Sequence, residues 1–491
     1  MSASTEEASP AQASPAQAGP ARASAAPASL ARGFAARLAS APADAVRSFH
    51  PSSMSMLSRR SYALELVSTL FFALALASVE GGIISVFVKQ TYRELVPKDL
   101  LVFMVALLGA APELANILSF VWTTLTHGKP KVPMINALQV VTIALIALVA
   151  LTPLTPLPAE WELVALGVLA IVARVCWSGI ITLRPTLWRA NYPSSERARM
   201  IGKFSTVQVL VVAAMGLVLG QLLDVNPQLF SVVVPICCAL GSIAVIATAR
   251  QRLRGEPRLL REEAESGPAM KPWQGPAAVV RTLRKDRRWA QFMAAMFLLG
   301  IGNLMLPPVL VVMMADEFRL GYLGSMLINV VIPLTLMPLF IPLWARLLDR
   351  SHVVRFRAIH SWVFVSATLV MTLAALLDQQ WMLYLGAVLL GAGYGGGSLA
   401  WNLGHMDFSP PAQTSHYMAT HITLNGVRGI VGPFVAATMY ALLSAAGLDA
   451  SFWVLALCTL LCVLGAIGFV WLRTEMDADV QRLKSQGRGA R

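Results

Sequence analysis

The chain has 491 residues, of which 56% are hydrophobic and only 13% are charged, and its formal net charge is +13. An average soluble protein carries roughly 25% charged residues, so this composition excludes an ordinary water-soluble domain. The basic residues lie in the gaps between apolar runs, which is typical of membrane topology and argues against nucleic-acid binding.

Residues 1–58 are rich in Ala, Ser and Pro. Such a segment cannot bury enough apolar surface to fold, and it lacks an apolar stretch of signal-peptide length. We expect a disordered cytoplasmic tail. Two alternatives stay open. One is an organellar transit peptide, because the stretch is rich in Arg, Ser and Ala; the other is a start assigned too early, because Met54 and Met56 precede Arg59.

Twelve apolar runs follow, each long enough to cross a bilayer. A membrane helix needs about 20 apolar residues, whereas a barrel strand needs about ten with alternating polarity, so these runs predict helices. The predicted spans are 62–88, 100–124, 133–154, 162–186, 202–223, 229–249, 289–315, 322–346, 356–377, 382–406, 417–445 and 451–473. The predicted fold class is therefore an all-α polytopic membrane protein.

One long gap divides the spans six and six. It is basic and ends in a segment that predicts a helix lying on the lipid headgroups. The expected domains are the tail 1–58, a six-helix bundle 59–249, the cytoplasmic linker 250–288, a second six-helix bundle 289–474 and a cytoplasmic tail 475–491.

Lys and Arg are unevenly distributed between the two sides of the membrane. One side holds eleven of them from Arg250 to Arg288 alone, and the other side holds Lys89, Arg93, Lys98 and Arg319. Because basic loops stay inside, both termini are expected in the cytoplasm, and the expected location is a bacterial inner membrane.

Short motifs at the span ends give a family resemblance. Gly128-Lys129-Pro130-Lys131 follows span two, and Ala345-x-x-x-Asp349-Arg350 follows span eight. Span four carries Arg174-Val-Cys-Trp-Ser-Gly179. With two sets of six spans, a basic central loop and both termini inside, residues 60–474 resemble the major facilitator superfamily. The first motif is degraded, because no Asp precedes Gly128.

The resemblance implies a secondary transporter in which two six-helix halves rock about a site at the midplane. Spans one, four, seven and ten then line the central cavity, spans two, five, eight and eleven flank it, and the motif residues Gly128, Lys129, Lys131, Asp349 and Arg350 form a cytoplasmic gate. The expected partners are a small-molecule substrate, membrane lipids and a coupling ion, most simply the proton, in symport or antiport. No nucleotide-binding loop is present, and no cofactor, metal or enzymatic activity is expected.

Polar residues inside the spans are the candidates for function, because a charge at mid-membrane costs at least about 2.5–3.5 kcal/mol. Uncharged amides accompany the charges, among them Asn329 in span eight. The residues predicted to serve substrate binding or coupling are Glu80, Glu113, Arg174, Arg428, Asn303, Asn402 and Asn425.

Depth along the helices suggests which charges pair. Glu113 and Arg174 lie at about the same level, roughly 20 Å from the outer surface, so we expect them to form a salt bridge. Glu80 then has no arginine and is the first candidate for proton coupling, with Glu113 second. Two alternatives remain: the salt bridge as a static brace, and Glu80 as a residue of the outer mouth.

Arg428 lies among glycines in span eleven without an obvious acidic partner, and a guanidinium there predicts an anionic substrate held in a bidentate fork. The alternative is a structural arginine bonded to helix carbonyls. Glu65 and Arg184, near the inner surface, are expected to reach water.

Glycines 391–397 predict close packing or a bend in span ten, and Pro307-Pro308 predicts a kink in span seven. The stretch from His405 to His421 matches no strong metal-ligand spacing. Two other functions remain open: a carrier-like sensor or scaffold that does not transport, and a membrane-embedded enzyme acting on lipid-linked substrates.

Overall fold

We describe the protein from a computed structural model, and the description is of residues 47–265, 274–409 and 414–489. The chain divides into a short N-terminal unit ending at Ser53 and a large unit from Met54 to Arg491. Of the N-terminal unit the structure describes only residues 47–53, with the 3-10 helix η1 (Pro51–Ser53). Most of the predicted tail 1–58 therefore lies outside the described residues, and the domain boundaries stay a prediction.

The described part of the large unit contains twelve helices that are long and apolar enough to cross a membrane, and they coincide with the twelve predicted spans. The all-α prediction is confirmed. Span one is built from two helices, and so is span two. The helices of the first six spans are α2 (Met56–Ala77), α3 (Gly81–Thr91), α4 (Lys98–Ile117), α5 (Ser119–Thr126), α6 (Lys131–Leu151), α7 (Ala159–Asn191), α8 (Ser194–Val225) and α9 (Phe230–Ala249).

The linker between the halves contributes α10 (Glu256–Glu265) and α11 (Gln274–Lys285). The helices of the last six spans are α12 (Arg287–Asp316), α13 (Tyr322–Met326), the π-helix η4 (Leu327–Val331), α14 (Ile332–Leu348), α15 (Val353–Leu377), α16 (Gln380–Leu403), α17 (Thr414–Ala445) and α18 (Ala450–Gly489). Short 3-10 turns are η2 (Thr152–Leu154), η3 (Pro227–Leu229) and η5 (Gly404–Asp407).

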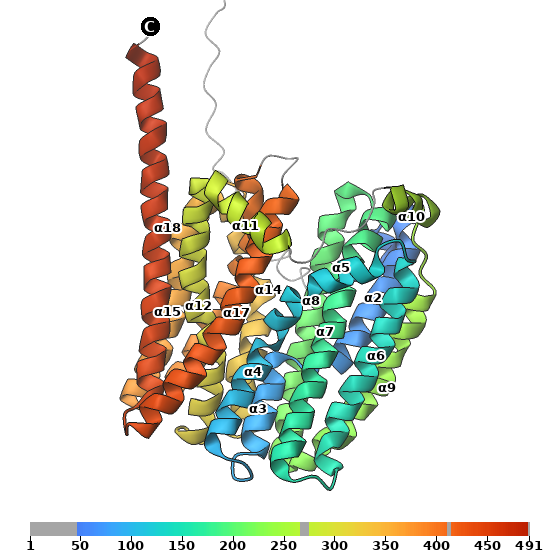
Figure 1. Cartoon of the computed structure of the whole chain (residues 1–491), viewed down its shortest axis with the longest axis vertical. Helices are drawn as coiled ribbons and strands as arrows, with labels where there is room; N and C mark the ends of the chain where they lie inside the picture. Colours follow the sequence, from blue (N-terminus) through green and yellow to red (C-terminus); the bar gives the residue numbers. More distant parts are fainter. Residues whose placement is uncertain (1–46, 266–273, 410–413, 490–491) are drawn as a thin grey trace, which may run out of the picture. The chain divides into compact units, whose positions relative to one another are not determined.

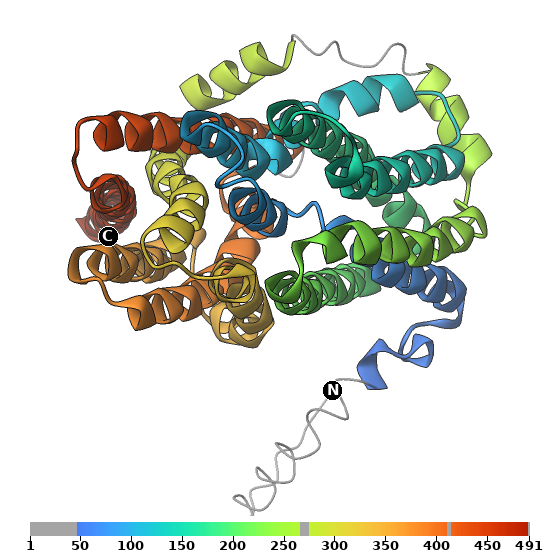
Figure 2. The ribbon, with the colours of Figure 1, turned by 90° about the horizontal axis from the view of Figure 1, so that it is seen from below.

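The first six spans (blue to green) and the last six (yellow to red) form two groups of helices that lie side by side (Figures 1 and 2). We call the end of the bundle that carries α10 and α11 the linker side, and the opposite end, where α3 ends at Thr91, the far side. α18 runs without a break as far as Gly489, so residues 475–489 of the predicted tail continue the last span as a helix.

Helix irregularities cluster at mid-bundle. Span one is interrupted between α2 and α3, where Glu80 has an extended backbone with φ −65° and ψ 133° and two glycines follow. Consecutive glycines weaken a helix, so interrupting the helix here costs little free energy. Span two contains Pro112, which removes a helical hydrogen bond next to Glu113. Span eight contains the π-helix η4 between α13 and α14, a feature often found at functional sites.

Close packing explains the glycine run of α16. A Cβ on Gly391 would lie 2.9 Å from the backbone oxygen of Pro333 in α14, and one on Gly396 would lie 2.4 Å from the His360 ring in α15. These distances are too short for any side chain, so the glycines let α16 fit between two neighbours. The packing interpretation of this run is confirmed. Pro307 and Pro308 lie inside an unbroken α12.

Candidate functional site

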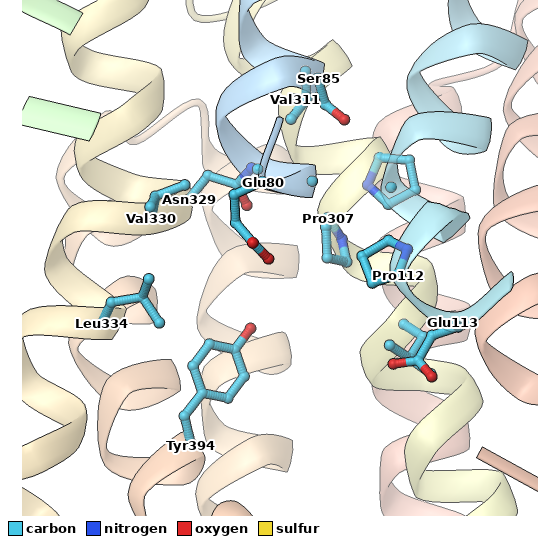
Figure 3. A pocket seen from close by; sticks show the side chains of 15 residues that line it. Glu80, Ser85, Pro112, Glu113, Pro307, Val311, Asn329, Val330, Leu334 and Tyr394 are labelled. Atoms are coloured by element: carbon cyan, nitrogen blue, oxygen red, sulfur yellow. The ribbon is translucent and has the colours of Figure 1, made fainter. Parts of the chain in front are cut away.

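A cavity of about 280 Å³ lies between the two halves at the level of these irregularities (Figure 3). Its polar lining comes from Glu80, Ser85, Glu113, Asn329 and Tyr394. The apolar and glycine lining comes from Gly81, Gly82, Gly109, Pro112, Leu304, Pro307, Pro308, Val311, Val330 and Leu334.

The expectation about which spans line the cavity is met in part. Spans one, seven and ten contribute as expected, but spans two and eight also contribute lining residues. Span four contributes none among the described residues. Its Arg174 does not line the cavity but forms a salt bridge with Glu80, which does. In the close-up, Glu80 and Glu113 lie on opposite sides of the cavity, and the hydroxyl end of Tyr394 is turned toward Glu80 (Figure 3).

The predicted Glu113–Arg174 salt bridge is wrong. Arg174 Nη1 lies 2.9 Å from Glu80 Oε2, and the Arg174 side chain is only 8% exposed. The break in span one places Glu80 at the start of α3, within reach of α7. Equal depth is necessary for a pair but not sufficient, because the two side chains must also point to the same side. The expectation that Glu80 has no arginine is wrong for the same reason.

Glu113 instead forms hydrogen bonds with amides. Asn425 Nδ2 donates to Glu113 Oε2 at 2.5 Å, and Asn116 Nδ2 donates to the same oxygen at 3.3 Å. Within the described part of the chain, no Lys or Arg lies within 4.0 Å of this carboxylate. The bond to Asn425 joins α4 of the first half to α17 of the second, so Glu113 lies in the seam between the halves.

Arg428 continues the series of hydrogen bonds that runs from Glu113 to Asn425. Its Nη1 donates to the backbone oxygen of Met296 at 2.5 Å, and its Nη2 donates to Asn425 Oδ1 at 2.5 Å. The fork predicted to hold an anionic substrate is therefore occupied by protein acceptors. This geometry corresponds to the structural alternative, with Arg428 bonded to a helix carbonyl.

Glycines bring α17 against α4 at this point. A Cβ on Gly429 would lie 2.2 Å from Glu113 Cγ, and one on Gly426 would lie 2.3 Å from Ile117. Further toward the far side, Phe103 and Phe434 continue the seam with ring centroids 5.4 Å apart. The seam therefore depends on small residues next to Glu113.

The other predicted amides do not belong to the hydrogen-bonded series of Glu113, Asn425 and Arg428. Asn303 is partly buried, its Oδ1 has no hydrogen-bond partner within the described residues, and it is not part of the cavity lining. Asn402 is exposed and its Nδ2 donates to the oxygen of Ser398 in its own helix. Asn329 does line the cavity, and the π-helix that presents it gives no signal in the sequence.

Polar contacts between the halves hold the far side closed. Lys89 Nζ lies 2.8 Å from Asp316 Oδ2, and Arg93 donates to the oxygen of Ala315 at 3.0 Å. Asp224 accepts hydrogen bonds from the backbone of Tyr322 at 2.7 Å and of Leu323 at 3.0 Å. A Cβ on Gly220 would lie 2.9 Å from Leu323 Cα, so α8 and α13 pack backbone to backbone beside these bonds.

On the linker side, the degraded motif binds the linker helix α10. The backbone N–H of Gly128 and Nζ of Lys131 donate to Glu263 Oε2 at 2.8 and 2.7 Å. Burial alone would raise the pKa of Glu263, but the hydrogen bonds from Lys131 and Gly128 outweigh burial and hold that pKa below its ordinary value of 4.5. Lys129, Asp349 and Arg350 are exposed.

Glu65 and Arg184 do not reach water, which corrects the prediction for both. Arg184 Nε lies 3.3 Å from Glu65 Oε1, and the two side chains are only 8% and 3% exposed. Gln251 Nε2 donates to Glu65 Oε2 at 2.8 Å. The two charges neutralise each other inside the first half instead of extending separately to the surface.

Comparison with known proteins identifies the family. The sequence profile described as Major Facilitator Superfamily matches residues 70–433 and, in a second overlapping alignment, residues 292–489. The chain belongs to the Major Facilitator Superfamily. It is therefore an integral multi-pass membrane transporter and not an enzyme, which removes the lipid-linked enzyme from the possible functions.

Solved structures of this superfamily share the fold. The nucleoside transporter NupG superposes with a TM-score of 0.61 at 14% identity, over 83% of this chain and 98% of that chain. The D-xylose–proton symporter gives a TM-score of 0.62 at 11% identity, over 84% and 96%. A partially occluded, inward-open structure of the xylose transporter XylE from E. coli gives 0.59 at 12% identity, over 85% and 98%. No curated protein matches this sequence.

Proposed function

We propose that this member of the superfamily is a proton-coupled secondary transporter that moves a small polar solute through the cavity between its halves by alternating access. The observation that carries the proposal is Glu113. It is a carboxyl group in the wall of the cavity, it has amide partners rather than a cation, and it joins the two halves through Asn425. A carboxylate in weakly polar surroundings is disfavoured unless it binds a proton or a cation.

Proton binding and the contact between the halves are linked in this arrangement. The ionised Glu113 accepts the hydrogen bond of Asn425 Nδ2, whereas a protonated carboxyl group has one acceptor oxygen fewer and one donor more. Protonation therefore changes the strength of a bond that closes the seam. Glu113 replaces Glu80 as the first candidate for the coupling group, because Glu80 already has a cationic partner in Arg174.

The lining favours a neutral or cationic solute over an anionic one. The two acidic residues of the lining, Glu80 and Glu113, carry carboxyl groups, and Ser85, Asn329 and Tyr394 add neutral polar groups. The anionic alternative depended on Arg428, whose donors are used within the protein. A cavity of about 280 Å³ corresponds to a metabolite of modest size.

Orientation follows from the distribution of positive charge. The linker side carries the basic linker, so we assign it to the cytoplasm and the far side to the exterior. With the far side closed by the Lys89–Asp316 pair, this structure then represents a state closed to the outside.

The test begins with a ligand screen by thermal shift on the purified protein, because a ligand that binds the folded state raises its apparent stability. Uptake of the identified solute into proteoliposomes then follows with and without a pH gradient. Glu113→Gln is expected to lower gradient-driven uptake at least about ten-fold while exchange of solute across the membrane continues. Glu94→Gln, at a side chain that is 86% exposed, is the matched control and is expected to behave as wild type.

Glu80→Gln distinguishes a residue that couples transport to protons from one that only stabilises the fold. This substitution leaves Arg174 without its carboxylate, so exchange and gradient-driven uptake are both expected to fall. Full gradient-driven uptake by Glu113→Gln overturns the role of Glu113. If wild-type protein binds the solute but shows neither uptake nor exchange, the proposed transport of that solute is overturned, and the result favours a sensor role for the binding.

A further inference from the structure

The linker helix α11 lies at the outer edge of the bundle, on the linker side. It runs obliquely near the linker-side ends of α12 and α17 (Figure 1), and in the view along the bundle it lies outside the membrane-crossing helices of the second half, as the yellow-green helix at the upper edge (Figure 2). It packs against both α17 and α12. Its last residue, Lys285, is two positions before Arg287, where the membrane-crossing helix α12 begins. The helix therefore lies at the level at which lipid headgroups surround the bundle.

The chain turns between α11 and α12 at Asp286. This residue has an extended backbone, with φ −118° and ψ 98°, so the two helices do not form one straight rod. Its carboxylate is bonded to the second half: Oδ1 accepts the backbone N–H of Trp289 at 2.9 Å, and Oδ2 accepts the hydroxyl of Tyr417 in α17 at 2.8 Å. These hydrogen bonds fix the end of α11 against α12 and α17.

The two faces of α11 differ in composition. The inner face carries Val279, which is 8% exposed, and Leu283, which packs against the hydrophobic core. The outer face carries five exposed residues at spacings of three and four, which put them on one side of the helix. These five line a groove of about 830 Å³ along α11, and they are Ala277, Val280, Arg281, Arg284 and Lys285.

The three cations of this groove have no acidic partner. Within the part of the chain that the structure describes, no carboxylate lies within 4.0 Å of Arg281, Arg284 or Lys285. On the other linker helix, α10, Arg258 does have such a partner, because its Nε lies 2.7 Å from Glu262 Oε1. The groove on α11 therefore concentrates positive charge that the described chain does not neutralise.

We propose that the outer face of α11 binds the phosphate groups of anionic phospholipids in the membrane leaflet on the linker side. Each Lys or Arg near an anionic membrane surface favours binding by about five-fold. The short apolar side chains of Val280, which is 46% exposed, and Ala277 lie at the boundary between headgroups and acyl chains, while the longer basic side chains reach the phosphates. Apolar and basic residues on one face, beside a membrane span, favour a lipid over a water-soluble polyanion.

This site is separate from the cavity between the halves and does not depend on the role of Glu113. α11 is nevertheless attached to two helices that contribute to that cavity or to the seam beside it. α12 supplies Pro307 to the lining, and α17 supplies Asn425, the partner of Glu113. Bound lipid is therefore expected to restrain the linker-side ends of both helices.

Hydrogen exchange of residues 274–285 in the full-length protein, reconstituted in lipid nanodiscs, tests the site. Discs of phosphatidylcholine are compared with discs in which part of this lipid is replaced by phosphatidylglycerol. Wild type is expected to show protection factors at least about ten-fold higher in the discs that contain phosphatidylglycerol. The triple variant Arg281→Gln, Arg284→Gln and Lys285→Gln is expected to lose this difference. Its three substituted side chains are exposed, so the variant is expected to fold as wild type does.

The matched control is Arg258→Gln with Arg261→Gln, which removes two exposed arginines from α10 and is expected to keep the full response of α11. Raised salt is expected to weaken the response of wild type, because salt screens exposed charges. Inositol hexakisphosphate added to phosphatidylcholine discs supplies phosphate groups without a lipid. A response to it as large as that to phosphatidylglycerol overturns the assignment to lipid. Equal protection of α11 in both kinds of disc, or an unchanged lipid response in the triple variant, overturns the proposal.

Discussion

The two halves differ in whether their buried charged side chains have partners of opposite charge. In the first half, Glu65 pairs with Arg184 at 3.3 Å and Glu80 with Arg174 at 2.9 Å. In the second half, Arg357 and Arg428 are both buried, and neither has a carboxylate within 4.0 Å in the described part of the chain. Glu113, at the seam between the halves, is also without a cation at that distance.

This difference separates fixed supports from groups that change partner. Two paired charges stabilise the conformation in which they meet, so a movement that separates them is costly. An unpaired buried charge is stabilised only when a proton, a ligand or water reaches it. Within the residues that the structure describes, the buried charges named here without an opposite charge lie at the seam and in the second half. Binding events are therefore expected there, and bracing is expected in the first half.

Breaking a pair in the first half is expected to have the largest effect on stability. Glu65→Gln leaves Arg184 buried without its counter-charge and is expected to lower the free energy of unfolding by about 3–5 kcal/mol. Denaturation of the purified variant in detergent measures this. The double variant Glu65→Gln with Arg184→Met is expected to recover most of the loss. A stable single variant would show that Glu65 is not a brace.

Removing an unpaired charge is expected to act in the opposite direction. Arg357→Met takes away a buried cation that has no described carboxylate partner, so the protein is expected to keep or gain stability, by about 1–3 kcal/mol. The same denaturation series reports it. A loss as large as that of Glu65→Gln would contradict the distinction between the halves, because it would mean that the protein itself pairs Arg357.

The linker contact is expected to have the smallest effect and to depend on pH. Glu263 is 21% exposed, so its pair with Lys131 is expected to contribute only about 0.2–1 kcal/mol. Its pKa in the folded protein lies below 4.5, so this contribution is present above the unfolded value and is lost as the pH falls through the folded value.

Hydrogen exchange of residues 256–265 measures that contact. The protection factor, which compares the observed rate with the intrinsic rate at the same pH, is expected to be high at neutral pH and to fall at acidic pH in wild type. Lys131→Met is expected to show low protection factors at both pH values, and the exposed neighbour Lys129→Met is expected to match wild type. Equal protection in Lys131→Met and wild type would show that α10 is held by other contacts.

The twelve spans could be predicted because the thickness of the hydrocarbon core fixes the length of an apolar run, whatever the details of packing. The pairing of charges could not. Counting residues along straight helices gave the depth of Glu113, Glu80 and Arg174 but not the side of the helix on which each one lies. The break before Gly81 then turned Glu80, not Glu113, toward Arg174.

The surroundings of two further residues could not be predicted for related reasons. Asn329 reaches the cavity from a π-helix, and the apolar sequence around it is equally compatible with a regular helix. Arg357 falls at the predicted edge of span nine, where an arginine is expected to reach water. The helix begins earlier, at Val353, and packing against α16 and α18 buries Arg357 to 3% exposure.

The central claim is that protonation of Glu113 controls how the two halves meet. Spin labels at Leu95→Cys and Leu448→Cys, in exposed far-side loops of the two halves, report that contact without any knowledge of the substrate. The five native cysteines are buried, so labelling should favour the new ones. Pulsed electron paramagnetic resonance is expected to show a distance distribution that shifts between acidic and alkaline pH in wild type and stays constant in Glu113→Gln. An unchanged pH response in Glu113→Gln would contradict the claim.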